Sequence, residues 1–600
     1  MTPTIVWGLL GLWWLLDGLR LRGRIAALQP VPLRSSEPIA LNEDYRLLLR
    51  PGAVVEPAMA QAAIAYARAH NLEVLDLVPQ HIDVSRAMMF AAAVDPATFR
   101  KNRLAKGHSV AAALVVQVSL IERCGELDMV PKTALEFQRL AIALKLHAAI
   151  DADFAIAQFS GVDEPFAERA ELVDEIFGGF ARPLVALQAL LALLGPWFSP
   201  MVGGAALVLL HLQPAIALYR TSIRPKRLGR EIVLRTFYDL AMALGLFVRA
   251  PVPADDPIAA RRPIYDALLR DGVDRFFEPR RDSCPLCSGA ELKLVLDTQD
   301  VYQHKPGRFR LERCRQCGHI FQNPRLSLAG LDFYYRDFYD GLGETLLGGI
   351  FGGGTGPYYA RADMVKQVAS PRRWLDVGAG HGHFCLLARD RLPDTKFDGS
   401  DLSAALEEAV RRRWIDVGHR GLLLDLANDL AVAEPRYDAL SMSHYLEHTR
   451  DPEAELQAAA TILSPGGHLL IDVPNPECSF RFLFGRYWTP WFQPQHQHML
   501  SARNLERLLR KHHFEPLQWH YREACLANGF TFAALCVIHW LFPFSDVPWQ
   551  PPRSRVRIVM SAIAWRLALP VLLLAFVADR LLAPLFRLSS NTFRVLAKKT

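Results

Sequence analysis

Three glycines follow a strand-like segment in the stretch WLDVGAGHGHF, residues 374–384. Glycines at such a turn let the backbone adopt positive φ and approach a ligand closely. A dinucleotide-binding G-x-G-x-x-G would need its third glycine where His383 stands, and no Gly-Lys-Ser/Thr follows to cradle phosphates. Because Asp376 precedes the glycines, we expect a cationic or amino-bearing ligand rather than a pyrophosphate.

Two further acids follow expected strands. The strand expected at residues 396–400 ends at Asp401, about 20 residues beyond the glycine loop, where a carboxylate can accept from both hydroxyls of a ribose. A third strand expected at 422–424 ends at Asp425, which is placed to accept from an adenine amine. A simple loop cap is the alternative for Asp425.

A second chemical pattern consists of two C-x-x-C pairs, which are formed by Cys284, Cys287, Cys314 and Cys317. Zinc takes four such thiolates tetrahedrally, and the strand-like segments 292–296 and 309–312 suit a zinc ribbon. Four thiolates leave no open coordination position, so we expect a structural metal. A redox role, which needs an exposed thiol of low pKa, is the alternative.

From about residue 284 to 600 the chain resembles class I S-adenosylmethionine-dependent methyltransferases that carry an amino-terminal zinc-binding module. Five stretches carry the resemblance in the family's order: RCRQCGHIFQNPRLS, LDVGAGHGHF, SDLS, YLEHTRDP and LSPGGHLLIDVPNP. The resemblance implies an α/β fold with a doubly wound, Rossmann-like sheet of seven strands. The last strand would be antiparallel, and residues 591–597 fit it.

The resemblance also implies roles for single residues. The methionine part of S-adenosylmethionine would lie against Asp376, Gly378, Gly380 and Gly382. Asp401 would hold the ribose and Asp425 the adenine, and His444 would lie beside the sulfonium.

Methyl transfer needs a base only when the acceptor must lose a proton. Histidine can serve near neutral pH. The expected catalytic residues are Glu447, His448, His496 and His498. Hydrogen bonding without catalysis is the alternative for each of them.

Three apolar regions indicate contact with a membrane. Residues 5–16 are apolar but short for a span, which needs about 20 residues, so we expect an interfacial anchor or a short signal anchor. No charge occurs between Arg182 and Arg220, and prolines and glycines in the middle of this interval favour a helical hairpin with both ends on the cytoplasmic side. Charges within residues 530–586 favour amphipathic interfacial helices over a span. Buried core helices are the alternative reading.

The composition is compatible with this view. The chain has 600 residues, of which 51% are hydrophobic, and a net charge of +6 without one basic stripe, so nucleic-acid binding is not expected. The five cysteines outside the two pairs are scattered, which favours a reducing compartment. The D-x-D at Asp151 and Asp153 is a weak sign of a glycosyltransferase, because surface aspartates at a helix end explain it equally well.

We therefore expect a membrane-associated methyltransferase with a cytoplasmic catalytic domain, which acts on a lipid-linked, sugar or natural-product-like small molecule. The expected parts are an anchor (1–25), a mostly helical or mixed α/β domain (26–250) with its hairpin (183–219), a linker (251–282), a zinc ribbon (283–325) and the methyltransferase (326–600). Two alternatives stay open: a bifunctional protein with a glycosyltransferase-like first part, and a non-catalytic cofactor-binding scaffold. The sequence does not indicate an oligomeric state.

Overall fold

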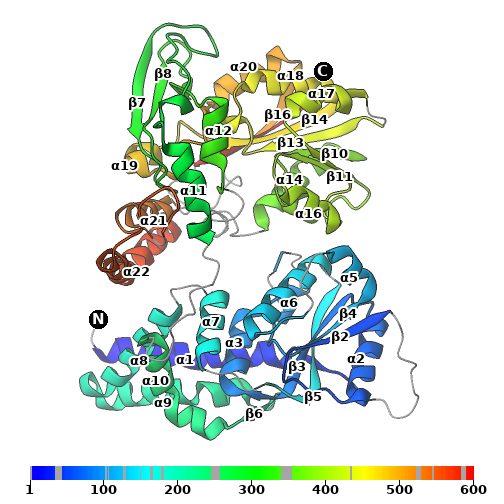
Figure 1. Cartoon of the computed structure of the whole chain (residues 1–600), viewed down its shortest axis with the longest axis vertical. Helices are drawn as coiled ribbons and strands as arrows, with labels where there is room; N and C mark the ends of the chain where they lie inside the picture. Colours follow the sequence, from blue (N-terminus) through cyan, green and yellow to red (C-terminus); the bar gives the residue numbers. More distant parts are fainter. Residues whose placement is uncertain are drawn as a thin grey trace. The chain divides into compact units, whose positions relative to one another are not determined.

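The computed structural model divides into two compact units, Met1–Val252 and Pro253–Thr600 (Figure 1). It describes residues 3–33, 44–101, 104–105, 107–125, 130–148, 151–162, 166–177, 181–244, 257–338, 355–432, 435–521, 529–543, 546–582 and 590–600.

The first unit is mixed α/β. Its strands are β1 (Gln29–Pro30), β2 (Tyr45–Leu49), β3 (Val74–Asp83), β4 (Ala113–Gln117), β5 (Ala152–Ser160) and β6 (Arg224–Lys226). They follow the order β1-β5-β3-β4-β2, and β6 pairs with the end of β3. The helices beside this sheet are α2 (Pro57–Ala69), α3 (Val84–Ala93), α4 (Pro96–Phe99), α5 (Val118–Cys124), α6 (Ala134–Ala148) and α7 (Phe166–Phe177).

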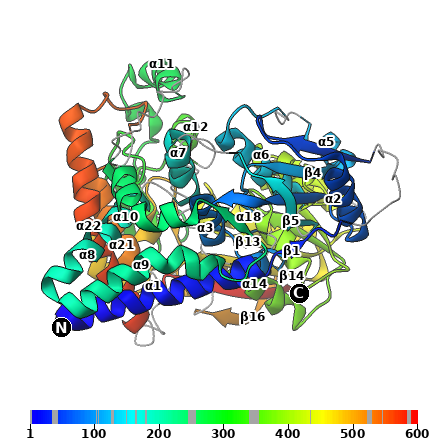
Figure 2. The ribbon, with the colours of Figure 1, turned by 90° about the horizontal axis from the view of Figure 1, so that it is seen from below.

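Apolar helices complete this unit, and α1 and α9 run side by side (Figure 2). They are α1 (Pro3–Ala26), α8 (Ala181–Phe198), α9 (Pro200–Leu218) and α10 (Leu228–Leu244). The chain reverses at Ser199, as the expected hairpin requires. Gly195 and Gly203 let α8 and α9 touch, since a Cβ on Gly203 would lie 2.0 Å from the Gly195 carbonyl oxygen. Small residues at such a contact are typical of membrane helix pairs.

The helix at the amino end is longer than the apolar run at residues 5–16 indicated. Helix α1 has 24 residues, and its segment Thr4–Ala26 is long and apolar enough to cross a membrane, as is Pro200–Leu218. The apolar run in the sequence ends before the arginines that follow the tryptophans, so the sequence indicated a shorter helix. In the structure the helix continues because Leu21 and Ile25 are buried in the core of the first unit.

The second unit contains a seven-stranded sheet in the order β12-β11-β10-β13-β14-β17-β16. Strand β17 runs antiparallel to both of its neighbours, β14 and β16. The strands are β10 (Arg373–Val377), β11 (Lys396–Asp401), β12 (Gly418–Arg420), β13 (Tyr437–Ser443), β14 (Leu463–Pro474), β16 (Phe514–His520) and β17 (Thr592–Lys599). The expected doubly wound sheet is confirmed. The helices around it are α14 (Gly356–Lys366), α15 (His383–Ala388), α16 (Ala405–Arg411), α17 (Leu423–Val432), α18 (Pro452–Ile462) and α20 (Ala502–Lys511).

The expected third strand at 422–424 was wrong. The strand is β12, and the leucine run begins α17, whose buried residues Leu423, Ala427 and Leu430 recur with helical spacing. A short run of leucines does not distinguish a strand from a helix. Asp425 consequently lies exposed in the first turn of α17 rather than at a strand end.

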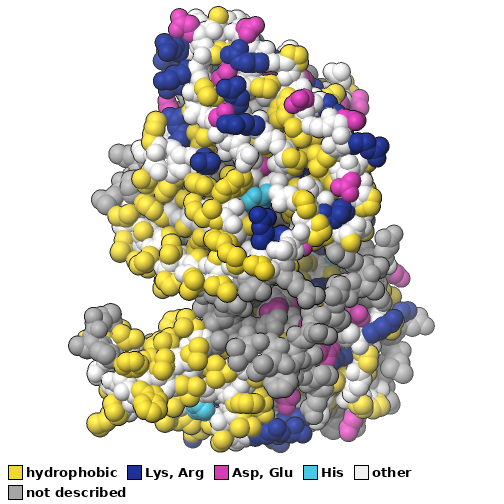
Figure 3. Space-filling view, turned by 60° about the vertical axis from the view of Figure 1, so that its left-hand side comes forward, with side chains coloured by type: hydrophobic (Ala, Val, Ile, Leu, Met, Phe, Trp, Pro, Cys, Tyr) yellow, Lys and Arg dark blue, Asp and Glu magenta, His cyan; other side chains and the backbone are white. Residues whose placement is uncertain are grey.

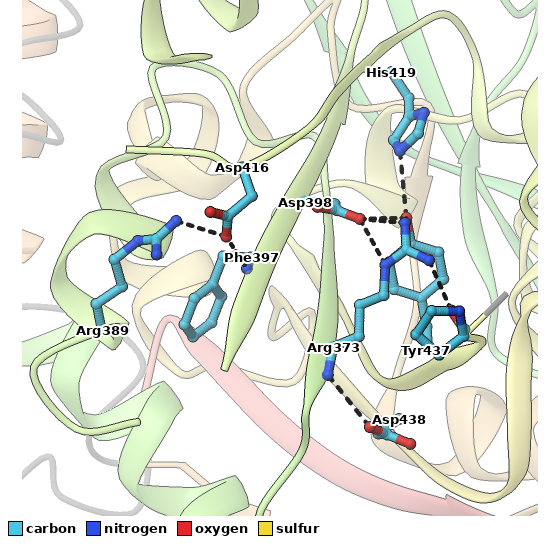
Figure 4. A network of polar contacts seen from close by, with 9 residues as sticks. Arg373, Arg389, Phe397, Asp398, Asp416, His419, Tyr437 and Asp438 are labelled. Atoms are coloured by element: carbon cyan, nitrogen blue, oxygen red, sulfur yellow. Dashed lines mark hydrogen bonds and ion pairs between the residues drawn. The ribbon is translucent and has the colours of Figure 1, made fainter. Parts of the chain in front are cut away.

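Away from the glycine loop, polar side chains join the strands of this sheet (Figure 4). Arg373 donates to Asp398 at 2.7 and 2.9 Å, and Tyr437 donates its hydroxyl to the same carboxylate at 2.7 Å. Asp416 accepts from the backbone of Phe397 at 2.7 Å. These bonds fix the registers of β10, β11 and β13, and therefore the loops at the other ends of these strands.

A four-stranded sheet in the order β15-β9-β8-β7 holds the cysteine pairs. Its strands are β7 (Leu292–Thr298), β8 (Phe309–Cys314), β9 (Ile320–Gln322) and β15 (His498–Met499). The expected ribs at 292–296 and 309–312 lie in β7 and β8. Strand β15 comes from the sequence after β14, so this small sheet is joined to the methyltransferase region rather than being a separate module.

The linker expected at 251–282 is also corrected. Residues 251–256 lie outside the described part, but helix α11 (Pro257–Leu269) and the 3₁₀ helix η1 (Asp274–Phe276) follow. Tyr265 and Phe276 are buried in one cluster with Phe333 of helix α12 (Leu328–Tyr335). The many charges of the segment lie outside this apolar face, and for that reason its composition resembled a linker.

Between β16 and β17 the chain forms α21 (Gly529–Leu541) and α22 (Arg555–Leu582). Helix α22 is continuous through Pro570, and its segment Val556–Leu582 is long and apolar enough to cross a membrane. Neither Pro570 nor the charges of this segment interrupt the helix, and whether it lies in a membrane interface stays a prediction.

Candidate active site and metal centre

The glycine loop joins β10 to α15 with three left-handed residues. Gly378, Gly380 and Gly382 have φ of 73°, 52° and 73°. A Cβ on Gly378 would lie 3.1 Å from the Tyr445 ring, whereas one on Gly380 would meet nothing within 4 Å. Gly380 therefore faces open space where a ligand can approach the backbone.

Asp401 lies at the end of β11, beside the same loop. Its Oδ2 accepts from the Gly380 backbone N–H and its Oδ1 from that of Ser403, both at 2.8 Å. Each carboxylate oxygen keeps a second lone pair for a hydroxyl donor. The structure thus brings the acid and the glycine loop together, as the sequence predicted.

Asp376 is the buried acid of the site. Its Oδ1 accepts from the Ser441 hydroxyl at 2.5 Å, and that hydroxyl in turn accepts from the Trp374 indole N–H at 2.8 Å. Burial raises the pKa of Asp376 to about 6, against the opposing effect of the Ser441 hydrogen bond. A buried carboxylate with this raised pKa is matched to a cation, because a cationic ligand favours its ionised form.

These features fit S-adenosylmethionine. Open space lies at Gly380, a carboxylate stands at the end of the second strand, and a buried acid sits under the loop. The residues that would hold the cofactor are Asp376, Gly378, Gly380, Gly382 and Asp401. When bound, it supplies an electrophilic methyl group on a sulfonium.

His444 follows β13 and has a left-handed backbone, with φ of 52°. Its N–H donates to the Asp472 carbonyl at 2.9 Å, and its Nδ1 lies 3.1 Å from Glu447 Oε1. A non-glycine residue in this conformation is strained and is held by its surroundings. Glu447 is 1% exposed, and its Oε2 has no hydrogen-bond partner among the described residues.

His448 and His496 meet next to Glu447. Their ring centroids are 4.6 Å apart, and one ligating atom from each of the three residues lies within 4.8 Å of the others. Burial lowers the pKa of His448 to about 4, and burial together with His448 lowers the pKa of His496 well below its usual value. Both rings are therefore neutral near pH 7.

The tautomer of His496 follows from one contact. Its Nδ1 lies 2.8 Å from the carbonyl oxygen of Pro490, which can only accept, so Nδ1 carries the proton. Its Nε2 is then a lone-pair acceptor in the neutral ring. Of the three predicted histidines, this one has the clearest geometry for accepting a proton.

Tyr335 is a residue of the site that the sequence reasoning missed. Its hydroxyl lies 2.8 Å from Nδ1 of His448 and 3.2 Å from the carbonyl oxygen of Gln495. The stretch FYYRDFY after the cysteine pairs was noticed only as a whole, and nothing singled out this tyrosine.

Another missed group is a buried ion cluster at the ends of β14 and β17. Asp472 accepts from Arg361 and from Arg594, both at 2.6 Å, and from the hydroxyl of Ser443 at 2.9 Å. Burial opposes ionisation of Asp472, but the two arginines hold its pKa at about 2. The carboxylate and its two guanidinium partners are far apart in sequence, so no motif links them.

Two predicted residues lie apart from this site. His498 belongs to β15, where its Nδ1 lies 3.1 Å from Nε2 of His319 and the two rings stack. It is therefore placed to join the small sheet to the methyltransferase region rather than to contact an acceptor. Asp425 lies on the exposed surface of α17, as described above.

The four paired cysteines converge on one point. The sulfurs of Cys284 and Cys317 are 3.7 Å apart, and those of Cys287 and Cys314 are 3.6 Å apart. Tetrahedral zinc with bonds of about 2.3 Å separates its sulfur ligands by about 3.8 Å. This geometry fits a bound zinc ion.

The D-x-D of the first unit stands at the start of β5. Both oxygens of Asp153 contact Nε of Arg100, at 2.9 and 3.0 Å. Ligands of α/β sheets bind beyond the carboxyl ends of strands, and this pair lies at the opposite end. The arrangement favours the structural alternative for these aspartates.

Comparison with known proteins agrees with this geometry. Residues 358–518 match the family model described as a methyltransferase domain. The ubiquinone biosynthesis O-methyltransferase of Alkalilimnicola ehrlichii is 33% identical over 123 residues, which are 19% of this chain and 48% of that protein. The demethylmenaquinone methyltransferase of Deinococcus radiodurans is 29% identical over 161 residues, which are 26% of this chain and 62% of that protein.

Among solved structures, a SAM-dependent methyltransferase from Archaeoglobus fulgidus is 16% identical, with a TM-score of 0.27, over 43% of this chain and 99% of that one. The chain spans about half the length of the first curated relative and less than two thirds of the second. Residues 358–518 of this chain form a methyltransferase domain of the class I S-adenosylmethionine-dependent family.

Proposed function

We propose that this protein is a membrane-associated, S-adenosylmethionine-dependent methyltransferase that acts on a hydrophobic or lipid-linked small molecule. The observation that carries the proposal is the edge of the second unit's sheet. There Asp376 is buried at the end of β10, the backbone at Gly380 faces open space, and Asp401 accepts from the Gly380 N–H. Asp425 is not part of the proposed cofactor site, whereas His444 borders it.

The proposed reaction is an in-line displacement. The cofactor, which Asp376, Gly380 and Asp401 would hold, would supply the methyl group for transfer to the acceptor atom. The proton of the acceptor passes to Nε2 of His496, while the Nδ1 proton stays on His496 and is donated in the hydrogen bond to the Pro490 carbonyl. His448 and Glu447 orient this acceptor side, with Tyr335 positioning His448. His498 is proposed as a structural residue.

The acceptor class is supported by two features. Three helices are long and apolar enough to cross a membrane. Relatives include an enzyme of ubiquinone biosynthesis and a demethylmenaquinone methyltransferase. A quinone-like or other lipid-linked acceptor in the membrane combines both features, and sugar or natural-product-like groups fit the same site chemistry.

We place the catalytic domain on the cytoplasmic side. After the α8–α9 hairpin the chain carries five basic residues, Arg220, Arg224, Lys226, Arg227 and Arg230. Basic flanks stay in the cytoplasm. The paired cysteines are free thiols in the structure, and we propose that they hold one structural zinc ion.

The test uses the full chain in native membranes. Incubation with methyl-labelled S-adenosylmethionine, followed by mass spectrometry of the lipid extract, should reveal one labelled product. Asp376→Asn should strongly weaken cofactor binding and reduce label transfer, while Asp438→Asn, which changes a carboxylate remote from the loop, should preserve both. Cofactor binding without any labelled product would favour the non-catalytic scaffold.

A further inference from the structure

Helices α21 and α22 form an insertion that leaves and re-enters the same sheet. Strand β16 ends at His520, and β17, its antiparallel neighbour, begins at Thr592. The two helices are joined to each other by side chains of α22. Asp579 accepts from the first N–H groups of α21 at 2.9 Å, and the Trp565 indole donates to the Phe542 carbonyl at 2.7 Å, just beyond its last turn.

The start of α22 is also attached to the globular body. Just before the helix, Trp549 is 6% exposed and donates its indole N–H to the Gln303 carbonyl at 2.7 Å. The side chain of Gln550 donates to the His304 carbonyl at 2.9 Å. Since the other end of α22 is bound through Asp579 to α21, both ends are fixed to the same body.

This attachment restricts how α22 can meet a membrane. A helix of 27 residues is about 40 Å long, which is enough to cross the hydrocarbon core. If it crossed, however, its two ends would lie on opposite sides, and the body that holds both ends would enter the bilayer. The 13 residues of α21 reach only about 20 Å, so the hairpin cannot cross and return either.

The outer face of α22 is nevertheless apolar along its whole length. Its exposed side chains include Val556, Leu567, Val571, Leu574 and Leu581, which are 54–72% exposed. Figure 3 brings this side forward and shows hydrophobic side chains gathered over the second unit. So large an exposed apolar area is unfavourable in water and marks an interaction surface.

Neighbouring residues continue this surface. The short helix α19 (Phe480–Phe484) exposes Phe482 at 76% and Leu483 at 60%. It packs against α21, with the rings of Phe484 and Phe530 5.1 Å apart. Arg486, Arg557 and Arg580 are exposed on and beside these helices. Apolar residues bordered by arginines match a leaflet with anionic headgroups.

We propose that α22 lies in the plane of one anionic leaflet, with its exposed face among the acyl chains, and seats the catalytic unit on the membrane without crossing it. This inference rests on the proposed function and deepens it. We call the surface formed by α19 and α22 the membrane seat. It binds the membrane from one side only, although α22 has the length and composition of a span.

The seat is connected to the acceptor side of the active site. His539 of α21 contacts the Tyr302 carbonyl at 2.9 Å, and the Tyr302 hydroxyl donates to the Thr489 carbonyl at 2.9 Å. Thr489 begins the 3₁₀ helix η5 (Thr489–Trp491), which includes the Pro490 carbonyl that accepts from His496. A chain of hydrogen bonds therefore links the seat to the segment that holds His496.

The test places a photo-cross-linker in the full chain, reconstituted into vesicles that contain alkyne-tagged phosphatidylglycerol. The variant Leu574→p-benzoylphenylalanine should cross-link to the tagged lipid. The matched control is Val432→p-benzoylphenylalanine, which alters an equally apolar and exposed residue, 78% exposed, on α17. It should give no lipid adduct. Lipid contacts of helices α1 and α9 do not contribute to the measured adduct, because cross-linking takes place at the residue that carries the photo-cross-linker.

A second measurement separates a seat from a span. In oriented proteoliposomes an impermeant maleimide should label Pro552→Cys and Lys598→Cys from the same side, with the wild-type chain as background. Labelling from opposite sides would overturn the proposal, as would a cross-linked dimer in place of the lipid adduct at Leu574, or no adduct at all. Neither assay needs cofactor or turnover, so failure here is distinct from failure of the methyltransferase proposal.

Discussion

The hydroxyl of Ser441 donates a hydrogen bond of 2.5 Å to the carboxylate of Asp376, between neighbouring strands β13 and β10. This bond favours the ionised acid, while burial favours the neutral acid and raises its pKa to about 6. Asp376 can therefore change charge within the range of pH at which cofactor binding is measured.

Cofactor affinity should consequently depend on pH. A cationic ligand needs the ionised carboxylate, so affinity should rise about tenfold per pH unit below 6 and level off above it. Isothermal titration between pH 5 and 8 measures this change. Asp376→Asn should bind weakly with no such slope.

Ser441→Ala provides the matched control. Loss of its hydrogen bond removes support for the ionised form, so the pKa of Asp376 should rise further and the affinity curve should shift to higher pH. An unshifted curve would show that Ser441 does not set the charge of this acid.

Variants on the acceptor side of the site should change the rate of the chemical step without changing the affinity for the cofactor. His496→Gln should lower kcat by about 10²–10⁴-fold, the range typical of general-base removal, with the cofactor Kd unchanged. Once the acceptor is identified, steady-state kinetics on it measures this. A variant with the wild-type kcat would exclude His496 as the proton acceptor.

Tyr335→Phe should act through His448 and lower kcat less than His496→Gln does, because it removes only a positioning hydrogen bond. His498→Gln should leave kcat unchanged and lower the Tm, because His498 joins β15 to the small sheet. Comparing kcat and Tm for the three variants distinguishes a chemical role from a structural one.

The sheet was predictable because its signals are local. The glycine loop and Asp401 lie next to one another in space as strand order requires, and β10, β11 and β17 coincide with the strands expected. The placement of Asp425 failed because a leucine run fits a strand and a helix equally. Only the packing of Leu423 and Ala427 decides between them.

Contacts between segments that are far apart in the chain could not be predicted from the sequence. His498 was predicted as a base together with His496, yet it lies in β15 and pairs with Phe321 of β9, which places it in the small sheet. Tyr335, Asp472 and Arg594 were missed for the same reason, since their partners lie elsewhere in the chain. The attachment of α22 through Trp549 likewise appears only in the folded unit.

The paired cysteines should bind one metal ion per chain. Cys287→Ser should lose it and lower the Tm, whereas Cys124→Ser, in the first unit, should retain it. Mass spectrometry of metal content and differential scanning fluorimetry measure these effects. A chelator that removes the ion without changing the Tm would show that the site does not stabilise the second unit.

Breaking the buried ion cluster of Asp472, Arg361 and Arg594 should lower the free energy of unfolding substantially. Asp472→Asn removes the carboxylate that Arg361 and Arg594 share, and leaves two buried guanidinium groups without their counter-ion. Breaking a buried pair in this way costs about 3–5 kcal/mol, which chemical denaturation of the second unit would detect. Because the folded pKa of Asp472 lies at about 2, below that of an ordinary aspartate, its contribution is present above pH 4 and is lost as pH falls toward 2.

The control combines two changes. Asp472→Asn with Arg361→Met removes one excess positive charge, so it should recover part of the lost stability if unpaired charge is the cause. Asp438→Asn, which removes a carboxylate that accepts from the backbone N–H groups of Arg372 and Arg373, should cost much less. If the double variant is no more stable than Asp472→Asn, the effect arises from lost hydrogen bonds to Ser443 and Arg594 rather than from buried charge.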